Sequence, residues 1–361
     1  MPKTRVLIVD DSVVSRKFLS MIVSDEEDME VAGVAASGKI GLDRISQVNP
    51  DLIVLDIEMP DMDGITTLKR IRESYPKLPV IMFSSLTKKA STETLDAIAA
   101  GANDYVTKPS QTNSPEEALQ NIKKELIPKI RALCKTEAYP SKRPSITQTY
   151  SNKPKQHIKT HSVPASSSVP SAQIKIVVIG ISTGGPNALA TMLPSLPGDF
   201  PVPIVIVQHL PPIFTNTLAE RLDRISSLKV VEAKEGDKLI PGKVFIAPGD
   251  YHTSLKRFTN IVVIGLDQGP VENSLRPAAD VLFRSAAKLY GNSVLGVVMT
   301  GMGQDGLRGS ESIREAGGTI LVQDEESSVV WGMPGSVSRA GLAHLIVPLN
   351  EIASEIIRLV G

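Results

Sequence analysis

Short runs of Val, Ile and Leu alternate along most of this chain with longer segments whose apolar residues recur every three or four positions. The short runs predict buried strands, and the longer periodic segments predict amphipathic helices. Strands that alternate with helices need crossover connections, which produce a parallel sheet covered by helices. The pattern occurs before and after a polar stretch at about residues 135–173, and it therefore predicts two α/β domains.

The polar stretch is rich in Pro, Ser, Thr, Lys and Gln and has almost no large apolar residues. Such a segment buries too little apolar surface to offset the entropy lost on ordering it, so it predicts a flexible linker. The chain has 361 residues, which also exceeds one ordinary domain. We expect two doubly wound parallel-sheet domains, at residues 1–126 and 173–361, joined by a helical end and flexible linker at residues 127–172.

Charge and cysteine content narrow the class of protein. The 39 basic residues balance the 39 acidic residues, which gives no electrostatic reason to expect binding to nucleic acid or to an anionic membrane. Cys134 is the only cysteine, so an intramolecular disulfide or a cysteine-based zinc cluster is excluded. The first residues lack a signal-peptide layout, and no apolar run approaches the roughly 20 residues of a membrane span. We therefore expect a cytoplasmic protein without direct membrane insertion.

Polar residues follow four of the five strands predicted in the first domain. Asp10 and Asp11 follow the first strand, Asp56 ends the third, Ser84 ends the fourth and Lys108 follows the fifth. The carboxyl ends of parallel strands share one edge of the sheet, where open α/β sheets bind ligands. We therefore expect these side chains to converge on one pocket. The predicted strands span residues 5–9, 30–35, 52–55, 80–83 and 104–106.

Three of these residues are carboxylates, which repel one another unless a cation lies between them. A hard divalent cation prefers oxygen ligands, and Mg²⁺ is the expected ion. A cation held by Asp11 and Asp56 would shield Asp56 as a nucleophile, while Lys108 and the hydroxyl of Ser84 would contact the oxygens of an incoming phosphoryl group. The alternative is that Asp10 and Asp11 cap the following helix and that Asp56 begins a turn. The convergence of five polar residues favours the pocket.

Four motifs in this domain, VLIVDDS, DLIVLDIEMPDMDG, MFSS and DYVTKP, resemble the receiver domain of two-component response regulators across about residues 3–126. The resemblance implies a flavodoxin-like fold that accepts a phosphoryl group at Asp56 from a histidine kinase. It also implies that Mg²⁺ is held by Asp10, Asp11, Asp56 and the backbone carbonyl of Glu58. The residues that it implies for the phosphorylation switch are Ser84, Tyr105 and Lys108.

The second domain begins with a predicted strand at residues 174–179, the turn GISTGGP and a helical pattern at residues 187–193. The motif G-x-S-x-G is typical of a nucleophile elbow, in which a serine projects from the carboxyl end of a strand and helix N–H groups receive an oxyanion. Ser182 is therefore a candidate nucleophile. An ordinary turn stays an alternative. A phosphate-binding loop is disfavoured, because the turn lacks both the G-x-G-x-x-G spacing and the lysine of phosphate-binding motifs.

A serine nucleophile needs a base, and the chain has five histidines. His157 and His161 lie in the predicted linker, where no carboxylate or thiolate accompanies them as a metal ligand. His344 precedes its strand and would lie at the wrong end of the sheet. His209 and His252 both follow apolar runs, and His209 is preferred because it ends the next long strand after the elbow, and consecutive strands are often neighbours. A packing or capping role is the alternative for His209.

The base in turn needs a carboxylate that fixes the tautomer and the orientation of its ring. Asp305 lies in the glycine-rich loop TGMGQDG, after the predicted strand at residues 295–299, and is the preferred candidate. Asp324, after the predicted strand at residues 319–322, is the alternative. The order Ser182, His209, Asp305 differs from the order in α/β-hydrolases, so the elbow predicts the chemistry and not that fold.

Six motifs, IGISTGGP, QHLP, IAPGDYH, LRPAADVLFRSAA, TGMGQDG and VVWGMPG, resemble the catalytic domain of the chemotaxis protein-glutamate methylesterases across about residues 174–360. The resemblance implies a Rossmann-like domain with Ser182 as nucleophile, His209 as base and Asp305 as orienting acid. It places an oxyanion site at the backbone of Thr183 and Met302. It further implies cofactor-free demethylation, and deamidation of glutamines, on methyl-accepting chemoreceptors. Such proteins join a receiver to this domain in the same order.

Two other classes of function stay open on the residues alone. A phosphorylation-dependent DNA-binding regulator needs a helix-turn-helix and a basic face, whereas the second domain is rich in strands and nearly balanced in charge. A pure interaction module would bind a receptor through its glycine loops without chemistry. We expect a hydrolase whose receiver covers the Ser182 edge until phosphorylation of Asp56 shifts the packing of the two domains.

Overall fold

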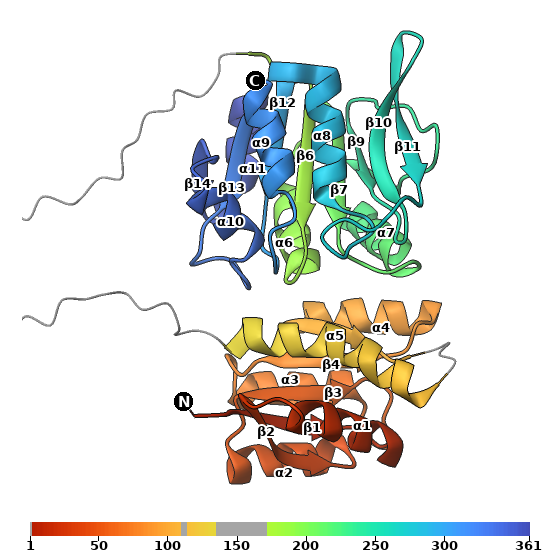
Figure 1. Cartoon of the computed structure of the whole chain (residues 1–361), viewed down its shortest axis with the longest axis vertical. Helices are drawn as coiled ribbons and strands as arrows, with labels where there is room; N and C mark the ends of the chain where they lie inside the picture. Colours follow the sequence, from red (N-terminus) through yellow and green to blue (C-terminus); the bar gives the residue numbers. More distant parts are fainter. Residues whose placement is uncertain (1, 110–113, 135–171) are drawn as a thin grey trace, which may run out of the picture.

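A computed structural model of the chain describes residues 2–109, 114–134 and 172–361. These residues form two α/β domains, with the N-terminal domain below and the C-terminal domain above in Figure 1. The predicted linker, with His157 and His161, lies outside the described residues apart from its ends. No helix in the described ranges is long and apolar enough to cross a membrane.

The N-terminal domain is built on a five-stranded parallel sheet with the order β2-β1-β3-β4-β5. All five predicted strands form, each within one residue of its expected ends. Every residue of β3 and β4 is buried, because helices cover both faces of the sheet. The strands are β1 (Thr4–Val9), β2 (Met29–Ala35), β3 (Leu52–Asp56), β4 (Val80–Ser84) and β5 (Asp104–Thr107).

Five helices cover the two faces of this sheet. One face packs against α1 and α5, and the other packs against α2, α3 and α4. The first four helices each begin after a Ser, Asp or Thr whose side chain accepts a hydrogen bond from a first-turn N–H. The helices are α1 (Val13–Ser24), α2 (Gly38–Val48), α3 (Gly64–Ser74), α4 (Lys88–Ala99) and α5 (Pro115–Cys134).

The C-terminal domain contains a seven-stranded parallel sheet with the order β14-β13-β12-β6-β7-β9-β8. The chain starts in the middle at β6, fills one side, and returns to fill the other side from β12. The boundary between β6 and β12 is therefore a topological switch point, where loops diverge and leave a crevice. The strands are β6 (Ile176–Ile181), β7 (Ile204–Gln208), β8 (Lys229–Glu232), β9 (Lys243–Ile246), β12 (Val294–Val298), β13 (Thr319–Gln323) and β14 (Leu345–Val347).

Helices cover both faces of this sheet as well, which confirms the prediction of two doubly wound α/β domains. Alternate residues of β6 point to opposite faces, so Val177 packs with α6, α7 and α11, and Val178 packs with α8, α9 and α10. The helices are α6 (Gly185–Met192), α7 (Phe214–Ile225), α8 (Ala279–Tyr290), α9 (Leu307–Glu315), α10 (Met333–Arg339) and α11 (Leu349–Val360), with short 3-10 turns η1 (Leu193–Ser195) and η2 (Gly291–Ser293).

An antiparallel hairpin, β10 (His252–Phe258) and β11 (Ile261–Asp267), stands beside the parallel sheet and was not predicted. Its inward residues Leu255 and Ile264 join the core beneath α8. The two-residue turn between the strands contains Thr259 with a φ of +51°, which glycine, asparagine or aspartate would adopt more readily. The absence of a glycine in the turn therefore hid the hairpin from sequence inspection.

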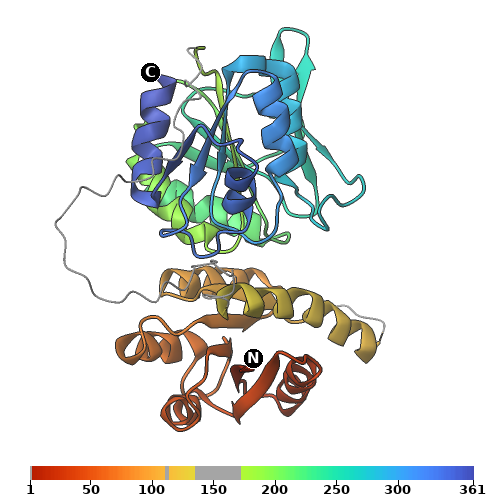
Figure 2. The ribbon, with the colours of Figure 1, turned by 60° about the vertical axis from the view of Figure 1, so that its left-hand side comes forward.

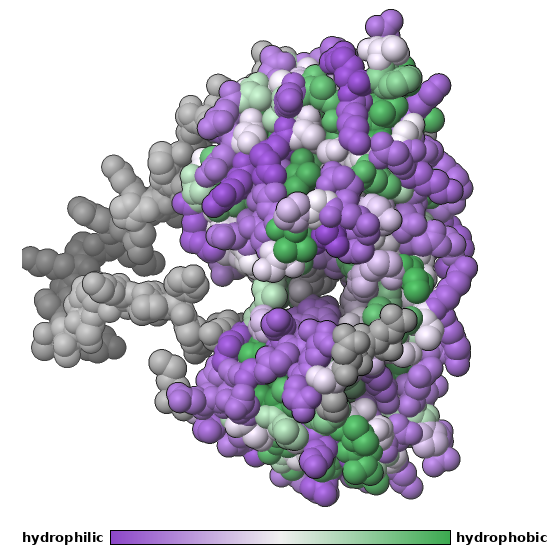
Figure 3. Space-filling view, turned by 45° about the vertical axis from the view of Figure 1, so that its right-hand side comes forward, coloured by the Kyte–Doolittle hydropathy of each residue, from purple (hydrophilic) through white to green (hydrophobic). Residues whose placement is uncertain are grey.

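The two domains meet where α4 packs against α6 and α7, as the views in Figures 1 and 2 agree. The rings of Tyr105 and Phe214 stack across the interface, with centroids 5.0 Å apart and planes 8° apart, and both side chains are buried. Hydrophilic residues predominate on the face of the molecule in Figure 3, and hydrophobic residues are scattered over it. The stacked rings of Tyr105 and Phe214 are thus a buried apolar contact between the two domains.

Candidate active site

Ser182 lies at the carboxyl end of β6, in the sharp turn that begins α6. Gly184 has a φ of +80°, a conformation that side-chain-bearing residues rarely adopt, so a glycine is needed for this turn. The Ser182 carbonyl accepts hydrogen bonds from the N–H of Gly185 at 2.7 Å and from Gln208 Nε2 at 3.0 Å. The turn therefore holds a partly exposed serine at the switch point of the sheet, as the elbow motif predicts.

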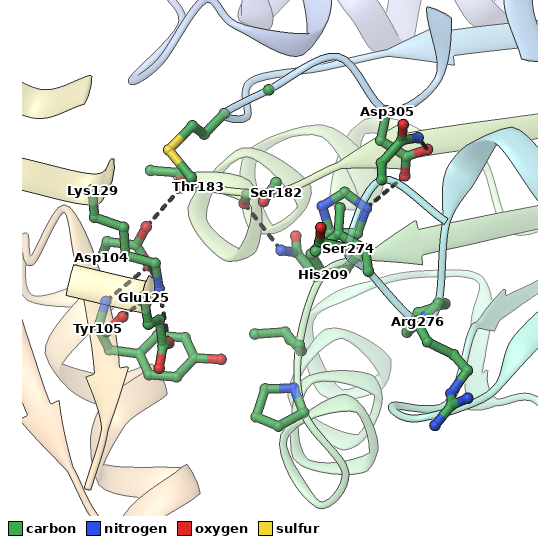
Figure 4. A pocket seen from close by; sticks show the side chains of 18 of the residues that line it. Asp104, Tyr105, Glu125, Lys129, Ser182, Thr183, His209, Ser274, Arg276 and Asp305 are labelled. Carbon is green, nitrogen blue, oxygen red and sulfur yellow. Dashed lines mark hydrogen bonds and ion pairs between the residues drawn. The ribbon is translucent and has the colours of Figure 1, made fainter. Parts of the chain in front are cut away.

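His209 directly follows β7, the neighbour of β6, and its N–H donates to the carbonyl of Ile181 at 3.2 Å. Its Nε2 atom lies 2.8 Å from Asp305 Oδ2, and Figure 4 shows the imidazole between Ser182 and Asp305. A proton on Nε2 would leave the lone pair of Nδ1 free to accept a proton. No hydrogen bond joins Ser182 Oγ to this ring among the described residues, and such bonds are often long before substrate binds.

Asp305 is 1% exposed and lies between β12 and α9, in the glycine-rich loop. Its carboxylate receives hydrogen bonds from two first-turn amides of α8, Ala279 N–H to Oδ2 at 2.6 Å and Asp280 N–H to Oδ1 at 3.1 Å. Burial alone would raise the pKa of Asp305, but the hydrogen bond and charge of His209, together with these amides, hold the pKa below its usual value. Asp305 is thus ionised at neutral pH and fixes the imidazole.

Two backbone N–H groups of the same site have no acceptor within the described part of the chain. Thr183 and Met302 line the cavity that contains Ser182 and His209, and neither N–H donates a hydrogen bond to any residue in the described ranges. Gly301 packs so closely that a Cβ there would lie 2.8 Å from Ser182 Cβ. The glycine therefore allows the Met302 loop to approach the elbow.

The cavity has a volume of about 940 Å³ and is lined by both domains. On the side of the N-terminal domain, Asp104 Oδ2 accepts a hydrogen bond from Thr183 Oγ1 at 2.6 Å, beside Ser182 (Figure 4). Asp104 Oδ1 accepts the N–H of Tyr105 at 2.8 Å and lies 3.4 Å from Lys129 Nζ. The Asp104 carboxylate thus connects Tyr105 to Thr183, the residue next to Ser182.

The predicted metal and phosphoacceptor residues also converge. Carboxylate oxygens of Asp10, Asp11 and Asp56 lie within 4.8 Å of one another, and Lys108 Nζ lies 2.7 Å from Asp56 Oδ1. Burial, and then the charge of Asp10, raise the pKa of Asp56 to about 6 although Lys108 opposes the shift. The Oδ2 atoms of Asp10 and Asp56 are buried without a hydrogen-bond partner in the described ranges. An all-oxygen donor set whose buried carboxylate oxygens lack a hydrogen-bond donor in the described ranges fits Mg²⁺.

The remaining predicted residues of this domain are Glu58, Ser84 and Tyr105, and they do not all lie at this pocket. The N–H of Glu58 donates to Asp56 Oδ1 at 3.3 Å, which places its backbone next to the carboxylate. Ser84 ends β4, and its Oγ accepts a hydrogen bond from Thr94 Oγ1 of α4 at 2.6 Å. Tyr105 is buried in the domain interface and not at the phosphoacceptor site. Of the predicted switch residues, Ser84 therefore contacts α4 and Tyr105 contacts the C-terminal domain, whereas Lys108 contacts Asp56.

Both halves of the chain match known families. The family described as response regulator receiver domain matches residues 6–120, and the family described as CheB methylesterase matches residues 177–356. A protein named protein-glutamate methylesterase/protein-glutamine glutaminase from Trichodesmium erythraeum is 53% identical over 364 residues, covering 100% of this chain and 100% of its own. The chain belongs to the CheB methylesterase family. It is a methylesterase that carries a receiver domain.

Relatives in other organisms extend the likeness to a solved structure. A protein of the same name from Thermotoga maritima is 41% identical over 356 residues, covering 99% of this chain and 98% of its own. The crystal structure of the Thermotoga maritima CheB methylesterase catalytic domain shares 46% sequence identity and covers 52% of this chain and 100% of that domain, with a TM-score of 0.51. The likeness includes the elbow and the Asp305 loop, which lie within the matched part of the CheB-family chain.

The competing residues lie elsewhere in this CheB-family domain. The ring of His252 is hydrogen-bonded to the carbonyl of Pro270 at 2.9 Å, and it begins β10. The ring of His344 accepts the N–H of Ile320. Asp324 accepts hydrogen bonds from the N–H and the hydroxyl of Ser327, in the loop after β13. The structure thus brings Asp305, and not Asp324, to His209.

Four polar residues of the CheB-family site were missed from sequence. Asn273 contacts Asp305, Arg276 holds Asp250 at the cavity wall with contacts of 2.6 and 3.0 Å, and Asp104 contacts Thr183. They lie in loops or at the start of a strand, where isolated polar residues carry no periodic signal. Only their partners across the fold mark them as part of the site.

Proposed function

We propose that this chain is a serine hydrolase of the cytoplasm that removes methyl groups from glutamate methyl esters of chemoreceptors and also deamidates receptor glutamines. The observation that carries the proposal is the contact of His209 Nε2 with Asp305 Oδ2, with the ring beside Ser182 at the switch point. The family of the chain and the names of its relatives support the substrate class.

The proposed chemistry begins with Ser182. Its Oγ attacks the ester carbonyl while His209 Nδ1 takes the hydroxyl proton, and the ionised Asp305 stabilises the imidazolium that forms. The N–H groups of Thr183 and Met302 then donate to the oxyanion, because neither donates a hydrogen bond to any of the described residues. The imidazolium returns its proton to the departing methoxy group, and methanol leaves.

The second half of the cycle regenerates the serine. Water loses a proton to His209 and attacks the acyl-enzyme, which releases the glutamate carboxylate and free Ser182. A glutamine follows the same route with ammonia in place of methanol. The steps use groups of this chain and water alone, and we expect no cofactor for hydrolysis.

Replacement of the nucleophile tests this function. Ser182→Ala should abolish methanol release from methylated receptors, because no other group in the proposed mechanism forms the acyl-enzyme. Phosphorylation of Asp56 by acetyl phosphate should be retained in the variant and serves as the control for folding of the receiver. Methanol release at the wild-type rate by folded Ser182→Ala would refute the proposal. Receptor binding without any methanol release by the wild type would favour a pure interaction module.

We further propose that phosphorylation controls this hydrolase. Asp56 would accept the phosphoryl group from a chemotaxis histidine kinase, with Mg²⁺ held by Asp10, Asp11, Asp56 and the Glu58 carbonyl. The ion would neutralise the carboxylates and the phosphoryl oxygens, while Lys108 would contact one of those oxygens. The buried Oδ2 atoms of Asp10 and Asp56, which accept no hydrogen bond from the described residues, support this assignment.

The interface supports inhibition by the unphosphorylated receiver. Asp104 and Tyr105 of β5 lie against Thr183 and Phe214, so this domain closes one side of the Ser182 cavity. If Ser84 turned toward a phosphoryl group on Asp56, it would give up its hydrogen bond with Thr94 of α4. Because α4 packs against α6 and α7, this loss would favour an arrangement in which the receiver has moved away.

A further inference from the structure

Asn273 joins two buried carboxylates behind the proposed triad. Its Nδ2 atom lies 3.0 Å from Asp305 Oδ1 and 3.0 Å from Asp280 Oδ2, so one amide group donates a hydrogen to each carboxylate. Asp280 and Asp305 are each 1% exposed. Two carboxylates buried so close together repel each other unless hydrogen-bond donors lie between them.

The other donors to these carboxylates are mostly backbone groups. Asp305 also accepts hydrogen bonds from His209 and from the first-turn amides of α8, and Asp280 Oδ1 accepts the N–H of Gly309 in α9 at 2.7 Å. Among the described residues, Asn273 is therefore the side chain besides His209 that sets the direction of the Asp305 carboxylate.

A tight turn presents the Asn273 amide. Asn273 and Ser274 have φ values of +54° and +63°, and Glu272 and Leu275 exchange backbone hydrogen bonds of 3.1 and 2.9 Å across them. Both oxygens of the Glu272 carboxylate accept hydrogen bonds of 2.6 Å from Arg284 of α8. The turn is thus fastened to the helix whose first amides hold Asp305. Two successive left-handed residues persist only where the surroundings enforce them.

The charges around this cluster have opposite effects on its two carboxyls. Burial, together with the charge of Asp305, raises the pKa of Asp280, whereas the pKa of Asp305 is lowered despite its burial. The other charged or titratable groups that face the cluster are the Glu272 and Arg284 ion pair, with His252 beyond it, and His209 on the cavity side. An N–H donor favours an ionised carboxylate, so loss of the Asn273 hydrogens would ease proton uptake by the whole cluster.

We propose that Asn273 is a positioning residue of the hydrolase site, which keeps the Asp305 carboxylate ionised and directed at His209 by sharing its amide hydrogens with Asp280. The inference rests on the proposed roles of Ser182, His209 and Asp305. Asn273 acts through Asp305 and contacts no reacting atom.

Asn273→Gly removes the amide and keeps a residue that adopts the left-handed conformation. In the full chain, kcat/KM for methanol release should fall about ten- to a hundredfold, mostly through kcat, because the imidazole loses its fixed partner. The acid limb of the pH profile of kcat/KM should shift upward by about one pH unit, because the ionised Asp305 carboxylate loses the hydrogen bond from Asn273. Asn49→Gly, the same change at a left-handed residue with a φ of +43° in the N-terminal domain, should leave both quantities unchanged.

Asn273→Asp separates the electrostatic role from a loss of packing. It preserves the size of the side chain, removes both hydrogens and adds a third carboxylate, so the acid limb should shift upward further than in Asn273→Gly. If Asn273→Gly does not fold, this variant alone decides. If a folded variant keeps the acid limb of kcat/KM at the wild-type pH, the proposal is overturned whatever the activity of the variant. A structural defect would lower activity without shifting this limb. Full activity in Ser182→Ala would instead refute the proposed triad on which the inference rests.

Discussion

Asp56 has a raised pKa because its carboxylate is buried beside that of Asp10, and Lys108 opposes the shift only in part. Burial disfavours the charged form, and the charge of Asp10 adds to the effect. A proton and Mg²⁺ therefore compete for the same carboxylate oxygens. At the scale of single residues, a divalent cation bound in this pocket would favour the ionised form of Asp56 and extend it to lower pH.

The affinity for Mg²⁺ should therefore depend on pH. The pKa of Asp56 is raised to about 6, so the carboxylate is ionised above that pH and becomes protonated as the pH falls through it. We expect the affinity measured by titration calorimetry to fall by about five- to tenfold per pH unit below pH 6, and to level off above pH 7. Asp56→Asn should bind more weakly and lose most of this dependence. A constant wild-type affinity from pH 5 to pH 7.5 would contradict the account.

Residues that meet at strand ends were predictable from sequence, and residues recruited from loops were not. Ser182, His209 and Asp56 end or follow strands of parallel sheets, so their convergence follows from topology. Asn273 is 32 residues from Asp305, and Asp104 is 79 residues from Thr183. Neither pair follows a periodic pattern, because the first depends on a turn conformation and the second on the docking of two domains.

At the scale of elements, the buried strands of both parallel sheets were predicted well because helices on both faces require continuous apolar runs. The β10 and β11 hairpin was missed because its turn lacks glycine. The packing of α4 on α6 and α7 was also beyond prediction, since all three helices are amphipathic and their polar faces do not reveal a partner. Asn187 illustrates this, because its Nδ2 atom donates to the carbonyl of Ile98 across the interface at 2.7 Å.

Replacing the hydrogen bond between Asn187 and the Ile98 carbonyl by a repulsive contact should release the receiver from the C-terminal domain. Asn187→Asp has the same size but places a carboxylate oxygen against the Ile98 carbonyl, which should weaken docking by about 1–3 kcal/mol. Asp in the first turn of α6 suits the helix dipole, so the C-terminal domain itself should keep its stability. We expect methanol release without phosphodonor to rise about fivefold or more.

The control for this variant is Asn216→Asp, in the first turn of α7, where the amide contacts Glu220 of the same helix. It should leave the basal rate of methanol release near the wild-type value. Equal basal rates in Asn187→Asp and the wild type, with both proteins folded, would argue against inhibition through this interface.

At the scale of the whole molecule, the Asp56 pocket and the Ser182 cavity are separate sites, and the contacts between the two domains lie between them. Ser84 is linked to α4 through Thr94, and Asp104 and Tyr105 of β5 touch the hydrolase domain directly. The Asp56 pocket and the Ser182 cavity are therefore connected by elements of the receiver that have contacts on both sides. A change of a few kcal/mol in docking is enough to shift the populations of the two arrangements strongly.

Methanol release from methylated receptors by the full chain, with and without acetyl phosphate and Mg²⁺, tests this account most directly. We expect a low basal rate that rises with the phosphodonor in the wild type, no rise in Asp56→Asn, and no release under either condition in Ser182→Ala. A phosphodonor response that persists in Asp56→Asn, or methanol release that persists in folded Ser182→Ala, would contradict the account.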